Sequence, residues 1–361
     1  MMPWTLGRYF FRRHLMTIFW FILGVVSLIF LIDFNSTSSE MSGLPGYTVS
    51  GGLAMTALRL PLILQQTIPF IMLFAGMTTL ITLNRKYELV VTRAAGISVW
   101  QFMTPFVLAS FLIGLLAVGV LNPLAAWGQR TALSVESKWQ GNKPHQKNET
   151  PPWIRQIYES DDAIIGADAI LEDGLKLSQV VVIHFSSDGR IILRQDARSA
   201  TLEDGYWLLN DVKESRPGEV LVTKKEVRMP TNLRKEFVRE RLSSPETVAF
   251  YDLSNKIEAA KSFGISTKAL ETQFHSLLSL PLLLVAMTLI SATVTLRFSR
   301  FAQPTAVILG GILSGFVLYV VTVLVKAFGS SGVVPPFIAT WIPVFVALAL
   351  GSTILLHQED G

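Results

Sequence analysis

The sequence predicts a membrane protein with six transmembrane helices in two groups of three and an extramembrane β-domain between the groups. Three observations predict it. Half of the 361 residues are hydrophobic and only 16% are charged, whereas about a quarter of the residues of a soluble domain are charged. Six windows are long and apolar enough to cross a bilayer, and one long polar stretch separates the third window from the fourth.

Each window is compatible with the roughly 20 mostly apolar residues that cross about 30 Å of hydrocarbon. The windows are approximately Leu15–Phe34, Leu60–Leu83, Val99–Leu121, Ser276–Leu296, Thr305–Val325 and Pro335–Leu356. A cleaved signal peptide is the alternative for the first window, but no small-residue cleavage site follows it. We therefore expect helices one to three in residues 1–121, the extramembrane domain and its connector in 122–273, and helices four to six in 274–361.

The basic residues of the short loops predict the orientation, because lysine and arginine accumulate on the cytoplasmic side. They gather before helix one, between helices two and three, and between helices four and five: Arg8, Arg12, Arg13, Arg85, Lys86, Arg93, Arg297 and Arg300. The opposite side has only Arg59 and Lys326. We expect both termini in the cytoplasm and the β-domain outside, in the periplasm of a Gram-negative cell.

Short segments rich in β-branched and aromatic residues predict strands within the polar stretch. They are Gln179–Phe185, Arg190–Arg194, Tyr206–Leu209 and Glu219–Thr223. Asp-Gly pairs at 173–174, 188–189 and 204–205 and a Pro-Gly pair at 217–218 supply turn residues between them. The pattern indicates an antiparallel sandwich or barrel. Beyond it, the helical spacing of Leu253, Ile257 and Ala260 predicts a helix over Asp252–Ser262 that leads back to the membrane.

Several classes of function are excluded by missing residues and motifs. The chain has no cysteine, which removes disulfides, thiolate metal sites and cysteine nucleophiles. It has no nucleotide-binding P-loop, no H-E-x-x-H and no G-x-S-x-G, so we expect neither an enzyme nor a bound cofactor. The basic residues are scattered without a nucleic-acid motif. No span carries the row of ionisable residues of an ion relay, so any motor must be a separate chain.

The loop from Asn84 to Ser98 predicts a short helix. Asn84 suits a helix N-cap, Glu88 suits the first turn, where the helix dipole favours an acid, and Gly96 suits the C′ position. Two interpretations remain open. In the first, the apolar stripe formed by Leu89, Val90 and Ala94 fits a groove on another protein. In the second, the helix lies flat on the membrane and Glu88 pairs with Arg85. Candidate coupling residues are Arg85, Glu88, Leu89, Val90, Arg93, Ala94 and Gly96.

Polar and aromatic residues within the spans are candidates for a substrate path. Helix two contains Pro61, Gln65, Gln66 and Pro69, which weaken its hydrogen-bond ladder and place amides at membrane depth. The aromatic candidates are Phe30, Phe34, Phe70, Phe316 and Tyr319, for which the alternative is contact with lipid or a neighbouring helix. Asp33 is the acid at the outer end of helix one, for which the alternative is an interfacial carboxylate that reaches water.

Taken together, these segments make the chain resemble the LptF/LptG family of lipopolysaccharide export permeases, and its LptG branch more closely than its LptF branch. The resemblance covers nearly the whole chain and rests on the order and spacing of five short motifs. They are Gly7-Arg-Tyr9, the prolines Pro61 and Pro69, Glu88-Leu-Val-Val91 with Ala94-Ala-Gly96, Gly315-Phe-Val-Leu-Tyr-Val320 and Val334-Pro335-Pro336.

The resemblance implies a set of partners in the bacterial inner membrane. An LptG-like chain pairs with LptF, and two copies of the ATPase LptB bind ATP and Mg²⁺ and dock on the cytoplasmic side. LptC adds a transmembrane helix, and a periplasmic bridge continues through LptA. The family's periplasmic domain is a β-jellyroll. The helix over 84–98 then becomes the coupling helix, with Glu88 facing the ATPase.

One departure from the family pattern concerns the lipid A phosphates. LptG proteins often carry basic residues at the outer end of helix one, whereas this chain has Asp33 followed by no base from Asn35 to Ser42. Arg130 matches another basic position of the family and is the candidate for binding the phosphates instead, for which the alternative is an ordinary solvated arginine. The resemblance implies a permease half that extracts lipopolysaccharide from the inner membrane. The alternative is a membrane scaffold or sensor whose β-domain binds an outer ligand.

Overall fold

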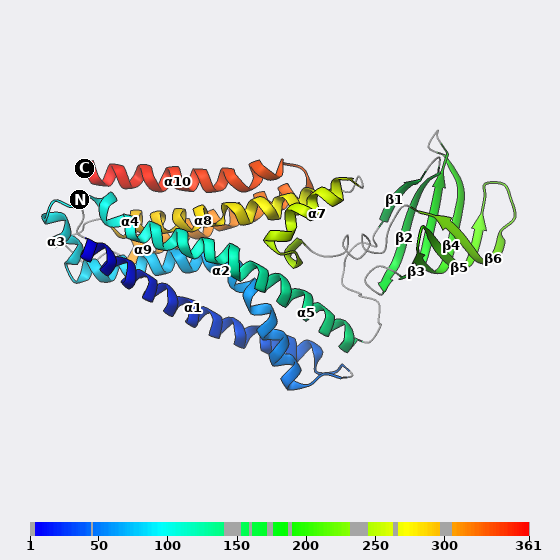
Figure 1. Cartoon of the computed structure of the whole chain (residues 1–361), viewed down its shortest axis with the longest axis horizontal. Helices are drawn as coiled ribbons and strands as arrows, with labels where there is room; N and C mark the ends of the chain where they lie inside the picture. The colour runs from blue at the N-terminus through cyan, green and yellow to red at the C-terminus, as the bar shows by residue number, and fades with distance from the viewer. Residues whose placement is uncertain are drawn as a thin grey trace. The chain divides into compact units, whose positions relative to one another are not determined.

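The structure is a computed structural model that describes residues 4–44, 46–140, 153–158, 161–171, 176–186, 190–231, 245–262, 266–296 and 305–360. The chain divides into two compact units (Figure 1). The helical unit consists of Met1–Trp139 and Pro245–Gly361, and the β unit consists of Gln140–Ser244.

Among the described residues, six long helices of the helical unit are apolar enough to cross a membrane, which confirms the predicted spans. The long helices are α1 (Trp4–Met41), α2 (Val49–Arg85), α4 (Val99–Leu116), α8 (Lys268–Thr295), α9 (Thr305–Ser331) and α10 (Pro336–Asp360). Shorter elements are α3 (Glu88–Ala94), η3 (Pro245–Thr247) and the predicted connector helix α7 (Phe250–Ser262). In α7, Leu253 is fully buried.

The third spanning helix continues far beyond its apolar window. A π-helical turn, Ala117–Leu121, joins α4 directly to α5 (Asn122–Gln140). The wider turn accommodates Pro123, which lacks a backbone N–H, so the proline does not end the helix. The expected β-domain began at residue 122, but the helix runs to Gln140 and the first described strand begins at Trp153. Hydropathy detects only the lipid-facing part of a helix, and the polar extension gives no such signal.

Helix α5 is attached to its neighbours by polar groups. Arg59 of α2 forms an ion pair with Glu136 of α5, with a distance of 2.8 Å from Nη2 to Oε2. The Asn122 side chain accepts a hydrogen bond of 2.8 Å from the backbone N–H of Phe250, at the start of α7. The extension is therefore fixed to both α2 and the connector.

Helix α8 is the centre of the helical unit. It packs against α2, α4, α9 and α10, and 78% of its most apolar window is buried, compared with 6% for α1. Small residues let the helices approach closely, as is common in membranes. A Cβ added to Gly114 of α4 would lie 2.4 Å from the Cα of Pro281 in α8. Ser110 of α4 and Thr288 of α8 share a hydrogen bond of 2.6 Å.

Over its described residues, the β unit forms a six-stranded antiparallel sheet in the consecutive order β1 to β6. The strands are β1 (Trp153–Tyr158), β2 (Asp161–Leu171), β3 (Lys176–Phe185), β4 (Ile191–Glu203), β5 (Tyr206–Ser215) and β6 (Val222–Pro230). The predicted antiparallel strands are confirmed, except that most of Glu219–Thr223 precedes β6. This order is a meander, and the described strands lack the crossovers that define a jellyroll. Two predicted turns, 173–174 and 188–189, fall outside the described residues.

A line of irregular residues crosses the middle of the sheet. Gln179 on β3, Arg198 on β4 and Asp211 on β5 lie opposite one another where the ladder pairing is interrupted. Gln179 and Asp211 have φ angles of 49° and 52°. The spacing of buried residues across this line is three instead of two on each strand: Leu177 and Val180, Ala197 and Ala200, Leu209 and Val212. Because all three strands shift together, the buried face stays continuous while the backbone bends.

A chain of polar side chains crosses β3 to β6 at one end of the buried face. His184 Nε2 lies 3.2 Å from Gln195 Oε1, and Gln195 Nε2 donates to Glu214 Oε1 over 2.9 Å. Lys224 completes the chain with an ion pair of 2.9 Å to Glu214. Burial alone would raise the pKa of the Glu214 carboxyl. The hydrogen bonds from Lys224 and Gln195, with the charges of Lys224 and Arg216, outweigh burial and lower this pKa below its ordinary value.

The lowered pKa predicts an acid-sensitive β unit. Glu214 stabilises the fold fully above the ordinary carboxyl pKa of 4.5, and this stabilisation is lost as the pH falls through the lower folded-state pKa. Hydrogen exchange of β5 in the full-length protein, corrected for intrinsic rates, should therefore accelerate on acidification. Glu214→Gln should weaken that dependence, whereas Glu226→Gln, at an exposed position on β6, should retain it. An unchanged pH profile in Glu214→Gln would contradict the assignment.

Candidate functional site

The short helix α3 lies at the same end of the helical unit as the start of α1 (Figure 1). Asn84 does not cap it, contrary to the prediction, because α2 continues through Arg85. The N-cap is Tyr87, whose φ of 59° reverses the chain into the new helix. Gly96 has a φ of +81° and its N–H donates to the Arg93 carbonyl over 2.9 Å. The predicted helix and its glycine stop are therefore present, but the start is a sharp turn that the sequence pattern did not indicate.

The two faces of α3 have different environments. Leu89 is fully buried and belongs to an apolar cluster with Phe10, Leu83 and Phe102. On the other face, Val90 is 42% exposed and Val91 is 66% exposed, beside the exposed Ala94 and the bases Arg85 and Lys86. Of the predicted coupling residues, Leu89 therefore anchors the helix, while Val90 and Ala94 contribute to an accessible apolar surface.

Glu88 contacts α1. Its Oε2 accepts a hydrogen bond of 2.9 Å from the Tyr9 hydroxyl, and its Oε1 lies 3.3 Å from Nη1 of Arg13. Arg13 also donates to the Tyr9 hydroxyl. These are the partners that the structure gives Glu88, in place of the Glu88–Arg85 pair of the membrane-surface interpretation. Tyr9 and Arg13 were not predicted as site residues, although their i, i+4 spacing places them on one face of a helix.

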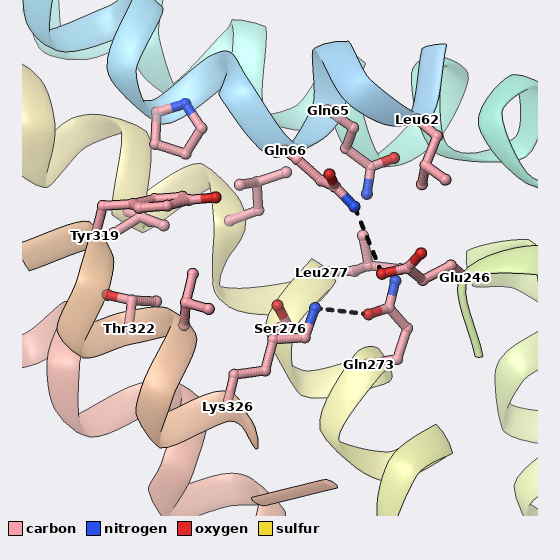
Figure 2. Close-up of a pocket in the computed structure, with 14 residues that line it drawn as sticks. Leu62, Gln65, Gln66, Glu246, Gln273, Ser276, Leu277, Tyr319, Thr322 and Lys326 are labelled. Carbon is pink, nitrogen blue, oxygen red and sulfur yellow. Dashed lines mark hydrogen bonds between the residues drawn. The ribbon is translucent and has the colours of Figure 1, made fainter. Parts of the chain in front are cut away.

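A second candidate site is a cavity of about 120 Å³ between α2, α8, α9 and η3 (Figure 2). Its wall combines apolar residues of α2, α8 and α9 with polar residues from all four elements. The polar lining residues are Gln65, Gln66, Glu246, Gln273, Ser276, Tyr319, Thr322 and Lys326. Lys326 Nζ donates to Gln273 Oε1 over 2.9 Å. A weaker contact of 3.5 Å joins Gln66 Nε2 to Glu246 Oε1.

Two of the predicted path residues meet beside this cavity. Phe70 of α2 and Tyr319 of α9 have ring centroids 4.5 Å apart, and Tyr319 lines the cavity. Gly315, one turn before Tyr319, lets α9 approach Leu73 of α2, because a Cβ there would lie 2.1 Å from a Leu73 methyl group. Phe316, on the same helix, is 53% exposed.

The remaining predicted residues lie on α1 and α5. Phe30 and Phe34 stack on each other along α1, with centroids 6.5 Å apart. Asp33 has one carboxylate oxygen that is buried without a hydrogen-bond partner among the described residues. Arg130 is exposed and donates to the Ala126 carbonyl of its own helix. Lys326 of α9 was predicted only as a base of the outer side, although a lone lysine in an apolar run indicates a functional position.

Over the described residues, no group of three or more His, Asp or Glu side chains is placed to hold a metal ion. Six candidate spanning helices among the described residues, with an inserted β-domain, define a multi-pass membrane protein. The chain belongs to the LptF/LptG family, because the family model described as lipopolysaccharide export system permease LptF/LptG matches residues 8–357. The comparison with curated proteins found no match.

Family membership makes this chain a lipopolysaccharide export permease of the inner membrane and a subunit of a transporter complex. The family model covers both branches and does not separate LptG from LptF. The resemblance seen in the sequence is thereby confirmed at the level of the family.

Proposed function

We propose that this chain is the LptG-type half of an ATP-driven lipopolysaccharide exporter. In this proposal it pairs with an LptF-type chain, two LptB ATPases dock on the cytoplasmic face, and LptC and LptA continue the path across the periplasm. Both termini are cytoplasmic and the β unit is periplasmic, as the loop charges predict. The proposal rests chiefly on the form of α3: a helix anchored by Leu89 that presents Val90, Val91 and Ala94 at the surface.

The form of α3 suits docking to another protein. Its exposed side chains are apolar and small, and the exposed bases Arg85 and Lys86 flank them. A short helix of this kind fits a groove whose floor is apolar and whose rim is polar. Closure of the ATPase pair on ATP would push α3, narrow the space between the two permease halves and expel the lipid towards the β unit.

The cavity between α2, α8 and α9 supplies a place for the polar part of the lipid. Lys326 is a cation beside amides and hydroxyls, which are donors for phosphate and sugar oxygens. In this proposal the lysine leaves Gln273 and pairs with a headgroup phosphate. Tyr319 and Phe70 then form an apolar edge for the first part of the acyl chains.

Reconstitution of the complex tests the proposal. We expect the ATPase to be stimulated by lipopolysaccharide only when this chain and its LptF-type partner are both present. Mass spectrometry of the purified complex should find lipopolysaccharide bound. Full stimulation of LptB by the LptF-type chain alone would overturn the proposal, and so would a complex that retains ordinary phospholipids but no lipopolysaccharide.

A further inference from the structure

The polar contact between α1 and α3 joins two helices that are far apart in the sequence. Glu88 lies 79 residues after Tyr9 and 75 residues after Arg13. The Arg13 and Glu88 side chains are 23% and 27% exposed, so the ion pair is more shielded than one at the surface. Arg13, Tyr9 and Glu88 form a closed set in which each contacts the other two. Such charge-assisted hydrogen bonds fix both distance and direction.

An apolar contact region lies beside this polar set. Phe10, next to Tyr9, and Leu89, next to Glu88, are both fully buried in the same cluster. Each of the two helices thus contributes one polar and one apolar residue at successive positions. Helix α3 is also joined to its neighbours by short segments, two residues after α2 and four residues before α4, with left-handed turns at Tyr87 and Gly96. Because these connections are short, a displacement of α3 is passed to the neighbouring helices.

Among the described spanning helices, α1 has the least buried apolar window. Only 6% of its most apolar window is buried, compared with 50% for α2 and 78% for α8. Its buried residues lie near its two ends: Phe10, His14 and Ile18 at the start, and Thr37 and Met41 at the finish. The contact with α3 therefore lies at the start of α1, where the helix is packed. The less buried middle of α1 can move when the start of the helix is displaced.

We infer that Tyr9 and Arg13 are positioning residues that hold Glu88 and transmit the displacement of α3 to α1. This inference rests on the proposed function, in which an ATPase pushes α3. Glu88 then has two roles: it lies at the edge of the docking surface and it connects that surface to α1. Without the tyrosine and arginine contacts, the ATPase still docks and hydrolyses ATP, but α1 does not respond.

Spin labels on the complete complex test the inference, and the absence of cysteine in this chain allows each label a unique attachment site. Leu28→Cys on α1 and Leu278→Cys on α8 place labels at exposed positions, with α8 as the central reference. With cysteine-free partner chains, the distance between the labels is measured without nucleotide and with trapped ATP. We expect a nucleotide-dependent shift in the parent chain, and its loss in Tyr9→Phe with Arg13→Gln.

Three further measurements separate the possible outcomes. Arg12→Gln removes the same charge at the exposed neighbouring position and should keep the shift, and Arg13→Lys should restore part of it. The Tyr9→Phe, Arg13→Gln variant should still co-purify with the ATPase and hydrolyse ATP. A shift that persists in this variant, or an α1 that does not move in the parent complex, overturns the inference. If the parent chain itself fails to bind an ATPase, the proposed function is wrong instead.

Discussion

Charge reversal at Glu88 is expected to abolish co-purification of the ATPase with this chain. A lysine at 88 would face Arg13, 3.3 Å from the present carboxylate, and would replace an acid at the edge of the exposed α3 face by a third base beside Arg85 and Lys86. Repulsion between like charges would displace the first turn of α3, and the docking surface would change both its charge and its position. Affinity purification of the chain with its partners, followed by quantification of the ATPase, measures the effect.

The control is a lysine placed at a distant exposed acid. Glu258 on α7 is exposed, and Glu258→Lys should leave co-purification unchanged. Arg13→Gln should also retain the ATPase, because it breaks the contact to α1 without adding a base to the docking surface. A scaffold or sensor that uses only its outer domain would lose little in Glu88→Lys, so an ATPase that remains bound to this variant would favour that alternative.

Substitution of Lys326 by methionine is expected to deplete lipopolysaccharide from the purified complex. Among the described residues that line the cavity, Lys326 is the cation. Its hydrogen bond to Gln273 holds the ammonium group at the cavity wall. A hydrogen bond to a charged group contributes about 1.5–3 kcal/mol, so its removal should lower the affinity for the lipid by roughly tenfold or more. Quantitative mass spectrometry of bound lipid and lipopolysaccharide-stimulated ATP hydrolysis measure the change.

Two matched variants define what the lysine does. Lys326→Arg retains the charge and should retain most of the bound lipid. Lys268→Met removes a lysine from an exposed position at the start of α8 and should have little effect. If Lys268→Met depletes the lipid equally, the effect comes from the net charge of this part of the protein and not from the cavity. If Lys326→Met binds lipid normally, the cavity does not belong to the substrate path.

The number of spanning helices was predictable because a span must be apolar over its whole lipid-facing length. The lengths of the helices could not be predicted, because helix formation outside the bilayer depends on tertiary contacts such as the Arg59–Glu136 pair. In the β unit, alternation of residue types indicated the strands. The irregular residues Gln179 and Asp211 gave no signal, since neither is a glycine and each has a positive φ only in the context of its neighbours.

The two candidate sites differ in how much the sequence revealed. The α3 helix was visible as a local pattern, including Glu88 in its first turn and Gly96 at its end. Its partners on α1 were invisible, because they lie 75 and 79 residues away along the chain. The cavity was only partly foreseen: Gln65 and Gln66 were noted as unusual, and Tyr319 as a candidate, but Lys326 joins them only when α9 packs beside α2 and α8.

The continuous helix formed by α4, the π-helical turn and α5 has a mechanical consequence. Its segments hold 18, 5 and 19 residues, which at 1.5 Å per residue gives a rod about 60 Å long, roughly twice the thickness of the hydrocarbon core. The Arg59–Glu136 pair and the Asn122–Phe250 hydrogen bond attach its polar half to α2 and α7, so a tilt of the rod carries both neighbours with it. A tilt of about 10° moves a point about 30 Å along the rod by about 5 Å. A small rearrangement among the closely packed helices would therefore become a larger displacement at the far end of the rod.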